Sequence, residues 1–309
     1  MRPASDQFDI EPDLGLAKFK MRKNMRVANV LLFLLLTLAA VGVYAEPANT
    51  LERIRGSGVV RLGFLESAPP FSYAENGKPP QGYSIDLCNG VVEGIGRQLQ
   101  IPNLRREWVK VTFQNRLAAV KEGRVDLDCG TTTWTLSRQE GVDFSLMTFI
   151  DGGSLLVRLG DPLARLTDFA GKSIAVVPGT TTADVLPREL KLRGVAARVV
   201  PVADERKGMA LLAAREVDAY ASDRLLLLGL ALDEKGQQAY KLIDEDYSIE
   251  PYALAMRRDD HDFRLAVNRS LARIYRTKEI VRIYDIWLGY LGRPGVVLSS
   301  MYLLQAIPE

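Results

Sequence analysis

Two strand-like apolar runs of this chain are each followed closely by the sequence Gly-Thr-Thr-Thr. The first run, 125–128, precedes residues 130–133, and the second run, 174–177, precedes residues 179–182. Three consecutive hydroxyl side chains suit neither a core strand nor a helix interior. They suit the corner between a strand and a helix, where Ser and Thr cap backbone N–H groups or contact a polar ligand. We therefore expect two similar strand ends that present hydroxyl groups.

Strand-like and helix-like segments alternate along most of the chain, which predicts an α/β fold with parallel sheets covered by helices on both faces. One helix begins near Ser84, which we expect to cap it, because apolar residues recur at three- and four-residue intervals up to Leu99. The predicted strands lie at 59–64, around Trp108, and at 125–129, 173–177, 197–202, 217–221 and 252–256, and the other predicted helices at 113–121, 183–193, 205–215, 224–235, 260–277 and 279–288.

Two parts of the chain also resemble each other. Residues 121–126 and 213–218 both place the end of a helix before Val-Asp at the start of a strand. Two similar α/β lobes would each turn the carboxyl ends of their strands toward a shared crevice, where open α/β sheets bind ligands. If the strand at 252–256 returns to the first lobe, two crossovers connect the lobes, as in a hinged clamp. The expected divisions are an N-terminal extension and signal peptide at 1–45, lobe 1 at 50–148 plus 252–290, lobe 2 at 149–251, and a C-terminal tail at 291–309.

The N-terminus carries the pattern of a secretory signal peptide. A basic patch at 21–26 precedes an apolar run from Val30 to Val43, and Val43 and Ala45 are small residues at the positions that determine cleavage. The apolar run is shorter than the ~20 residues of a membrane-spanning helix. We therefore expect cleavage near Ala45 and a periplasmic location. The alternative is an uncleaved membrane anchor.

Charge and histidine content exclude several classes of function. The leader holds six of the chain's 40 Lys and Arg and four of its 38 Asp and Glu, so the remainder is formally neutral. A neutral chain without a Lys/Arg block is a poor partner for nucleic acid or for an anionic membrane. His261 is the only histidine. The chain therefore has almost none of the residues that a zinc site or a Ser/His or Cys/His catalytic pair needs. We expect no metal and no cofactor.

Cys88 and Cys129 are the only cysteines. An even number of cysteines in an exported chain favours a disulfide, because the compartment is oxidising. The alternative is two buried thiols that do not meet. We predict the Cys88–Cys129 bridge, which would tie an early helix to the end of a strand beside the crevice.

Five stretches, in this order along the chain, together resemble a known family. They are Ala-Pro-Pro-Phe-Ser-Tyr at 68–73, Gly-Tyr-Ser-Ile-Asp-Leu at 82–87, Asp-Leu-Asp-Cys-Gly-Thr-Thr-Thr at 126–133 with Arg138 five residues on, Gly-Thr-Thr at 179–181, and Val-Asp-Ala-Tyr-Ala-Ser-Asp at 217–223. With them, the chain from about 50 to 290 resembles the bacterial extracellular solute-binding proteins of family 3, the amino-acid receptors of ABC importers. Ser84 stands where many members carry an acidic residue, although the glutamate/aspartate-receptor branch also tends to have Ser. The resemblance implies a type II periplasmic-binding fold, in which a two-stranded hinge joins two α/β lobes, a free amino acid as ligand, and an ABC transporter permease as partner.

The resemblance also implies roles for single residues. Arg138 is similar to the residue that pairs with the ligand α-carboxylate, and Asp223 to the partner of the α-ammonium. The chemistry agrees, because a guanidinium and the N–H groups of a helix start match a carboxylate, and an ammonium needs a fixed carboxylate. The alternatives are a surface arginine at 138 and a helix N-cap at 223. The other candidate ligand-binding residues are Thr131, Thr133, Thr180, Thr181 and Phe71, and the alternative role of the threonines is capping alone.

Two residues point to different ligand side chains. In the family, the position of Leu65 often carries Asp in receptors for cationic amino acids and Arg in receptors for glutamate and aspartate. Leucine offers no charge, and a charged ligand side chain against it would lose its solvation in a closed cleft. Arg116 is also seen in the acidic-ligand branch and could hold a side-chain carboxylate, or form an ion pair with a neighbouring acidic residue. We expect a neutral amino acid, with glutamate or aspartate as the alternative.

The expected function is that of a monomeric binding protein that closes on a free amino acid and delivers it to a permease. A different class is an enzyme on the same fold, because periplasmic cyclohexadienyl dehydratases look similar. That chemistry needs a general acid or base in the cleft, for which Glu66 or Glu205 is available. Neither lies in a stretch whose spacing demands catalysis, so we do not expect an enzyme. A sensor domain is a third class, and the absence of a later membrane span or signalling module argues against it.

Overall fold

The computed structural model describes residues 49–75, 77–231 and 237–309. The predicted signal peptide and its cleavage site lie outside these residues. In the part of the chain that is described, no helix has the length and apolar character needed to cross a membrane.

The first region of the fold alternates strands and helices, as the sequence predicts. β1 (Val59–Leu65) pairs in parallel with β4 (Arg105–Val111) on one side and with β5 (Leu127–Asp128) on the other. The predicted helix at 113–121 begins only at Arg116, and the strand predicted around Leu127 is shorter than expected. The other elements of this region are α2 (Thr50–Ser57), β2 (Ser67–Ala68), β3 (Ser72–Tyr73), α3 (Tyr83–Leu99), α4 (Arg116–Lys121) and α5 (Leu136–Gln139).

The helix α3 begins two residues earlier than predicted. Its apolar residues recur at three- and four-residue intervals and are buried along one face. The N-cap is Gly82, not Ser84 as predicted, and Ser84 lies buried in the first turn. Gly82 has a φ of 133°, and a Cβ at this position would lie 2.2 Å from the carbonyl oxygen of Phe71. A residue with a side chain therefore does not fit as the cap.

The second region repeats the pattern around β7 (Ser173–Val176), which pairs in parallel with β8 (Arg198–Pro201) and with β9 (Ala219–Asp223). Ile174 packs into one apolar cluster and Ala175 into another. Because successive strand side chains point to opposite faces, both faces of this sheet are covered. The other elements here are η1 (Leu166–Phe169), α6 (Thr181–Leu192), α7 (Glu205–Ala213), α8 (Arg224–Gly229) and β10 (Tyr240–Leu242).

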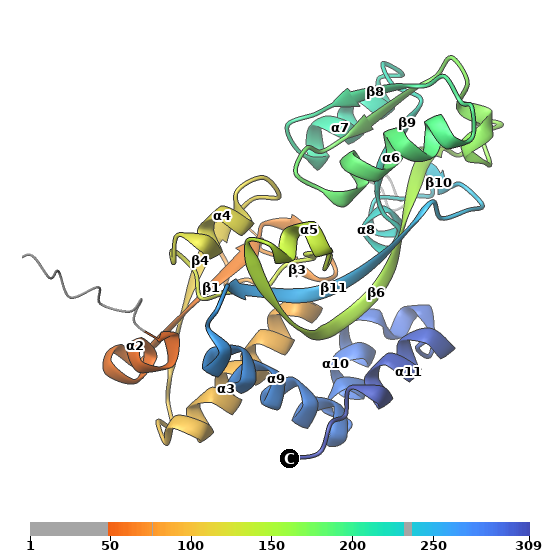
Figure 1. Cartoon of the computed structure of the whole chain (residues 1–309). Coiled ribbons are helices and arrows are strands. Elements are labelled where there is room, and N and C mark those ends of the chain that lie inside the picture. The colour runs from red at the N-terminus through yellow and green to blue at the C-terminus, as the bar shows by residue number, and fades with distance from the viewer. Residues whose placement is uncertain (1–48, 76, 232–236) are drawn as a thin grey trace, which may run out of the picture. The chain divides into compact units, whose positions relative to one another are not determined.

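Two long strands connect the regions. β6 (Val142–Arg158) was not predicted, and β11 (Ser248–Arg257) is longer than the predicted 252–256. They pair antiparallel along most of their length, and β11 also pairs antiparallel with β5, as β6 does with β9. The sheet is therefore mixed and not parallel throughout as expected; its order is β4-β1-β5-β11-β6-β9-β7-β8, with β10 paired to β6. The long strands β6 and β11 run side by side between the two regions (Figure 1). The predicted fold class, two α/β lobes joined by a two-stranded hinge, is confirmed.

The C-terminal residues include a packed helix where the sequence analysis expects a tail. α11 (Val296–Leu304) buries Leu298, Met301 and Tyr302. The hydroxyl of Tyr302 lies 2.7 Å from that of Tyr83 on α3, so this helix is part of the core of the first region. The preceding elements are α9 (His261–Arg276), α10 (Glu279–Leu288) and η2 (Gly289–Leu291).

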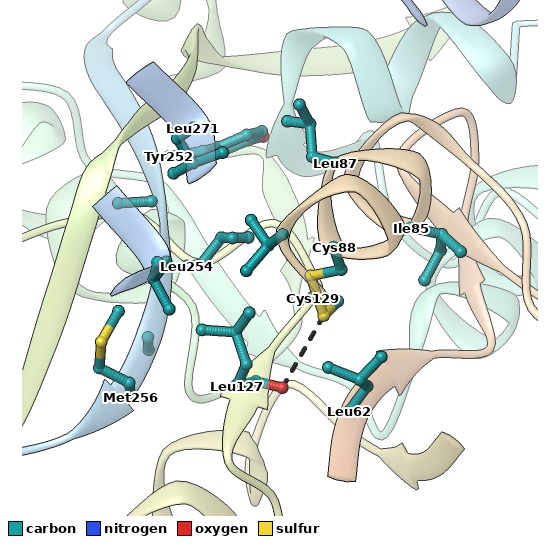
Figure 2. Packing of buried hydrophobic residues seen from close by; sticks show 14 of the residues in the cluster. Leu62, Ile85, Leu87, Cys88, Leu127, Cys129, Tyr252, Leu254, Met256 and Leu271 are labelled. Atoms are coloured by element: carbon teal, nitrogen blue, oxygen red, sulfur yellow. Dashed lines mark hydrogen bonds between the residues drawn. A yellow bond between two sulfur atoms is a disulfide. The ribbon is translucent and has the colours of Figure 1, made fainter. Parts of the chain in front are cut away.

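The predicted disulfide between Cys88 and Cys129 is present, with Cα atoms 6.1 Å apart. Cys88 lies on α3 and Cys129 follows β5, so the bridge ties the helix to the sheet at the point where the first Gly-Thr-Thr-Thr segment begins. Figure 2 shows the bridge among buried apolar side chains that include Leu62, Leu127 and Leu254. The disulfide therefore attaches the start of the first Gly-Thr-Thr-Thr segment to the core.

Candidate functional site

The two Gly-Thr-Thr-Thr segments meet at one carboxylate. Thr133 follows β5 and Thr181 opens α6, and their Oγ1 atoms lie 3.2 Å apart. Both hydroxyls donate to Oε2 of Glu250 on β11, over 2.7 Å from Thr133 and 2.5 Å from Thr181. All three residues are buried. The repeated sequence therefore marks two strand ends that converge, as expected.

Arg138 lies on the short helix α5 and contacts both segments. Its guanidinium donates to the carbonyl oxygen of Thr133 over 2.9 Å and to that of Gly179 over 3.2 Å. Burial lowers the pKa of Arg138, and the negative charges of Glu250 and Asp223 act in the opposite direction. Because a guanidinium has five N–H donors, these two bonds leave donors for a carboxylate ligand.

Asp223 ends β9 and stands at the N-cap position of α8, but its side chain makes no capping hydrogen bond. It accepts from the hydroxyl of Tyr252 over 2.5 Å and from that of Thr182 over 3.3 Å. Burial, together with the negative charges of Glu250 and Asp151, raises the pKa of Asp223 to about 8. At neutral pH this carboxyl therefore keeps a proton until a cation lies beside it.

Arg116 is buried, and its polar contacts are internal. Its Nε donates to Oγ1 of Thr132 over 2.6 Å and its Nη1 to the carbonyl oxygen of Phe113 over 2.5 Å. Thr132 in turn donates to Asp128 over 2.6 Å. Burial lowers the pKa of Arg116 to about 10, repulsion from Arg138 lowers it as well, and the charge of Asp128 opposes both effects. This placement favours a supporting role over contact with a ligand carboxylate.

Three other candidate residues have different surroundings. Thr180 caps α6, because its Oγ1 accepts from the backbone N–H of Ala183 over 3.2 Å. The hydroxyl of Thr131 is buried and has no hydrogen-bond partner among the described residues. Phe71 lies in the core, where its ring packs edge-on against the rings of Tyr83, Phe149 and Tyr252.

A cleft of about 820 Å³ lies between residues of the first and second regions. Of the predicted ligand-binding residues within the described ranges, Leu65 lines it and the others do not. Phe113 lines the same cleft from the first region, and Glu205 and Met209 of α7 line it from the second. Burial, with a smaller contribution from the charge of Asp204, raises the pKa of Glu205 to about 7. The cleft therefore combines apolar side chains with charged ones of both signs, the acidic Glu66, Asp204 and Glu205 and the basic Lys110 and Arg206.

Sequence reasoning missed two polar residues that the structure places in the site. Glu250 and Tyr252 flank Pro251 in β11, and both are buried. The available signal was an ionisable residue at the start of an apolar strand, since such a residue is buried only with polar partners. Among the residues that the structure describes, no group of His, Cys, Asp and Glu could hold a metal ion.

Comparison with known proteins gives concordant matches. The profile of the bacterial extracellular solute-binding proteins, family 3, matches residues 60–290. The chain is 30% identical over 239 residues to a glutamate/aspartate import solute-binding protein of Salmonella typhimurium, covering 77% of this chain and 79% of that protein. It is 31% identical over 252 residues to an L-glutamate/L-aspartate-binding protein of Pseudomonas aeruginosa, covering 81% and 83%. Among solved structures, an ancestral arginine-binding protein bound to arginine matches with a TM-score of 0.67 and 25% identity, over 75% of this chain and 99% of that chain.

Proposed function

Because this chain belongs to the bacterial extracellular solute-binding proteins of family 3, we propose that it captures a free amino acid between its two lobes and presents it to the permease of an ABC transporter. The observation that carries this proposal is the placement of Arg138 and Asp223 close enough for the charge of one to affect the pKa of the other. A free amino acid carries an ammonium and a carboxylate on neighbouring atoms. A guanidinium and a carboxyl group in one site offer a partner for each of these charges.

In the proposed complex, the α-carboxylate of the ligand accepts from the unused donors of Arg138. Backbone N–H groups at the start of α6, near Thr181, lie beside it and favour an anion. The α-ammonium binds Asp223, which then loses its proton. The hydroxyls of Thr131 and Thr133 lie at the same strand end and complete the polar wall.

We place lobe 1 at 50–148 plus 252–290, together with the packed helix α11, and lobe 2 at 149–251. The register of the long strands supports these boundaries, since Ile150 to Gly153 of β6 pairs with Ser248 to Pro251 of β11 between the two apolar regions. Two adjacent strands that cross between lobes can bend together, which is the property that a hinge needs.

We propose a neutral amino acid as the ligand. The support is the apolar wall that Leu65 and Phe113 give the cleft, together with Glu205, which repels an acidic side chain when it is ionised. Lys110 and Arg206, which line the same cleft, would attract an acidic side chain. Arg116, the residue that favoured an acidic ligand, is 2% exposed and donates to Thr132 and to the backbone carbonyl oxygens of Phe113 and Gly179. The relatives named for glutamate and aspartate make acidic amino acids the alternative ligand.

The family is extracellular, and we propose that this member is a periplasmic monomer whose signal peptide is cleaved near Ala45. The support for export is the basic and apolar leader pattern at 21–43. Mass spectrometry of the protein purified from the periplasm would locate the cleavage site, and a mass that includes residues 1–45 would contradict cleavage.

A second candidate function is a dehydratase reaction with Glu205 as general acid. The observation that favours it is the pKa of about 7, which suits proton transfer near neutral pH. Glu66, the other candidate, is exposed and pairs with Lys110. Incubating the protein with prephenate and arogenate tests this function, and turnover that disappears in Glu205→Gln would establish it.

A thermal-shift screen of the purified protein against the twenty amino acids tests the binding function. A ligand at a hundred times its Kd adds ~2.7 kcal/mol to the free energy of unfolding, which is enough to detect. We expect the largest shifts from neutral amino acids and none in Arg138→Ala. The absence of a shift with every amino acid would overturn the proposal.

A further inference from the structure

Glu250 has the surroundings of a bound carboxylate. Its Oε2 accepts from the hydroxyls of Thr133 and Thr181, and its Oε1 accepts from the hydroxyl of Ser248 over 2.6 Å. The residue is 1% exposed. Hydrogen bonds from hydroxyls to a buried, ionised oxygen are stronger than bonds between neutral groups. A carboxylate with three such donors is therefore held firmly in place.

The donors on Oε2 come from opposite sides of the hinge. Thr133 follows β5 in the first region, whereas Thr181 opens α6 in the second. Glu250 itself belongs to β11, where it pairs in register with Asp151 of β6. One oxygen on a connecting strand thus holds a hydroxyl from each lobe. The two bonds can exist together only while the two lobes are close.

Glu250 does not occupy the place proposed for the ligand carboxylate. The guanidinium of Arg138 donates to two backbone carbonyl oxygens and keeps further donors for a ligand. Glu250 uses hydroxyl donors, so the remaining donors of Arg138 are available to a ligand carboxylate.

The charge of Glu250 acts on the proposed ammonium site. The ionisable groups that face it are Arg138 on α5, Asp223 on β9, Tyr247 before β11 and Tyr252 on β11. Asp223 and Glu250 repel each other when both are ionised. An ammonium beside Asp223 offsets this repulsion, because it adds a positive charge next to a buried negative one.

We propose that Glu250 is a positioning residue that couples ligand binding to lobe closure: it holds Thr133 and Thr181 together across the hinge, and the ligand ammonium offsets the repulsion that arises between Glu250 and Asp223 once Asp223 loses its proton. This inference rests on the proposed function as an amino-acid receptor. It adds a residue that touches no ligand atom and sets the stability of the closed site.

Three substitutions separate the parts of this role. Glu250→Ala removes both the acceptor and the charge, and Glu250→Gln removes the charge but keeps one oxygen acceptor. Glu245→Gln is the matched control, because Glu245 accepts from the backbone N–H of Leu166 and lies outside the site. The variants are compared by calorimetry with the tightest of glutamine, leucine, glutamate and arginine. We expect a 10- to 100-fold loss of affinity for Glu250→Ala, as for one lost hydrogen bond to a charged group, a smaller loss for Glu250→Gln, and no loss for Glu245→Gln.

A second measurement reports on Glu250 without any ligand. Spin labels are attached at Glu122→Cys and Leu192→Cys, which are exposed positions in the first and second regions. Both native cysteines are in the disulfide, so only the new thiols react. The distribution of distances between the two spin labels then gives the fraction of molecules in which the lobes are closed. We expect Glu250→Ala to shift it toward longer distances and Glu250→Gln to restore part of the short-distance population.

A double-variant test asks whether the contact itself is responsible. Thr181→Val removes one donor, and adding it to Glu250→Ala should cause little further loss, because both changes break the same bond. Unchanged affinity and unchanged distances in Glu250→Ala, or tighter binding, would overturn the inference. If no amino acid binds the wild-type protein but Glu250→Ala still lengthens the ligand-free distances, the proposed function fails and the role of Glu250 in closure stands.

Discussion

Binding of an amino acid should release a proton at neutral pH, because Asp223 changes its protonation state. In the ligand-free protein, burial and the charges of Glu250 and Asp151 raise the pKa of Asp223 to about 8. At pH 7 about 90% of the molecules therefore carry a proton on this carboxyl group. A bound ammonium favours the ionised form, so the proton leaves when the ligand binds.

The pH dependence of the apparent Kd follows from the fraction of molecules in which Asp223 is ionised. With a pKa of about 8, the ionised fraction of Asp223 falls from about one half at pH 8 to about one hundredth at pH 6. If the carboxyl stays ionised in the complex over this range, the apparent Kd rises about 50-fold from pH 8 to pH 6. Lower pH thus weakens binding, and the change approaches tenfold per pH unit well below the pKa.

Calorimetry at pH 6, 7 and 8 measures this effect. At pH 7 the observed enthalpy should differ between two buffers by ~0.9 of the difference in their ionisation enthalpies. Tyr252→Phe provides a directed test, because the hydrogen bond from Tyr252 lowers the pKa of Asp223. Its loss should move the pH profile toward higher pH. A constant Kd from pH 6 to pH 8, with enthalpies that do not depend on the buffer, would show that Asp223 does not change its protonation state when the ligand binds.

Other substitutions have equally definite outcomes. Arg138→Ala should weaken binding by a few hundred- to a few thousand-fold, since loss of one partner of a buried charge pair costs ~3–5 kcal/mol; unchanged affinity by calorimetry would place the carboxylate site elsewhere. Replacing Cys88 and Cys129 by Ser should lower the free energy of unfolding in urea by ~4 kcal/mol, because the bridge closes a 41-residue separation; an unchanged midpoint would mean that the bridge does not constrain the unfolded chain. Glu205→Arg should raise the affinity for glutamate at least tenfold relative to wild type, because it replaces a repelling group in the cleft with an attracting one; an unchanged ranking of ligands in a thermal-shift assay would show that Glu205 does not face the ligand side chain.

The sequence predicts the parts of the fold that depend on local signals. The apolar face of α3 and the parallel strands around β1 and β7 follow from periodicity within short windows. The strand β6 was missed because its pairing with β11 joins residues about a hundred positions apart. The same limit applies to α11, whose contact with Tyr83 spans 219 residues.

The site residues also differ in whether a local sequence pattern indicates them. Arg138, Thr133 and Asp223 lie in motifs, so a resemblance points to them before the structure does. Glu250 belongs to none of the quoted motifs, and the two threonines that donate to its Oε2 are 117 and 69 residues away in the sequence. A carboxylate whose partners are assembled only by folding leaves no local pattern. Its burial is visible only in three dimensions.

We propose that the protein recognises both charges of a free amino acid, the carboxylate at Arg138 and the ammonium at Asp223. The most direct test is a calorimetric comparison of the amino acid that gives the largest thermal shift with its N-acetyl derivative and its α-amide. Each derivative removes one charge and keeps the side chain. We predict that both bind at least a hundredfold more weakly than the free amino acid. Equal affinity for either derivative would show that the protein does not recognise the charge which that derivative lacks.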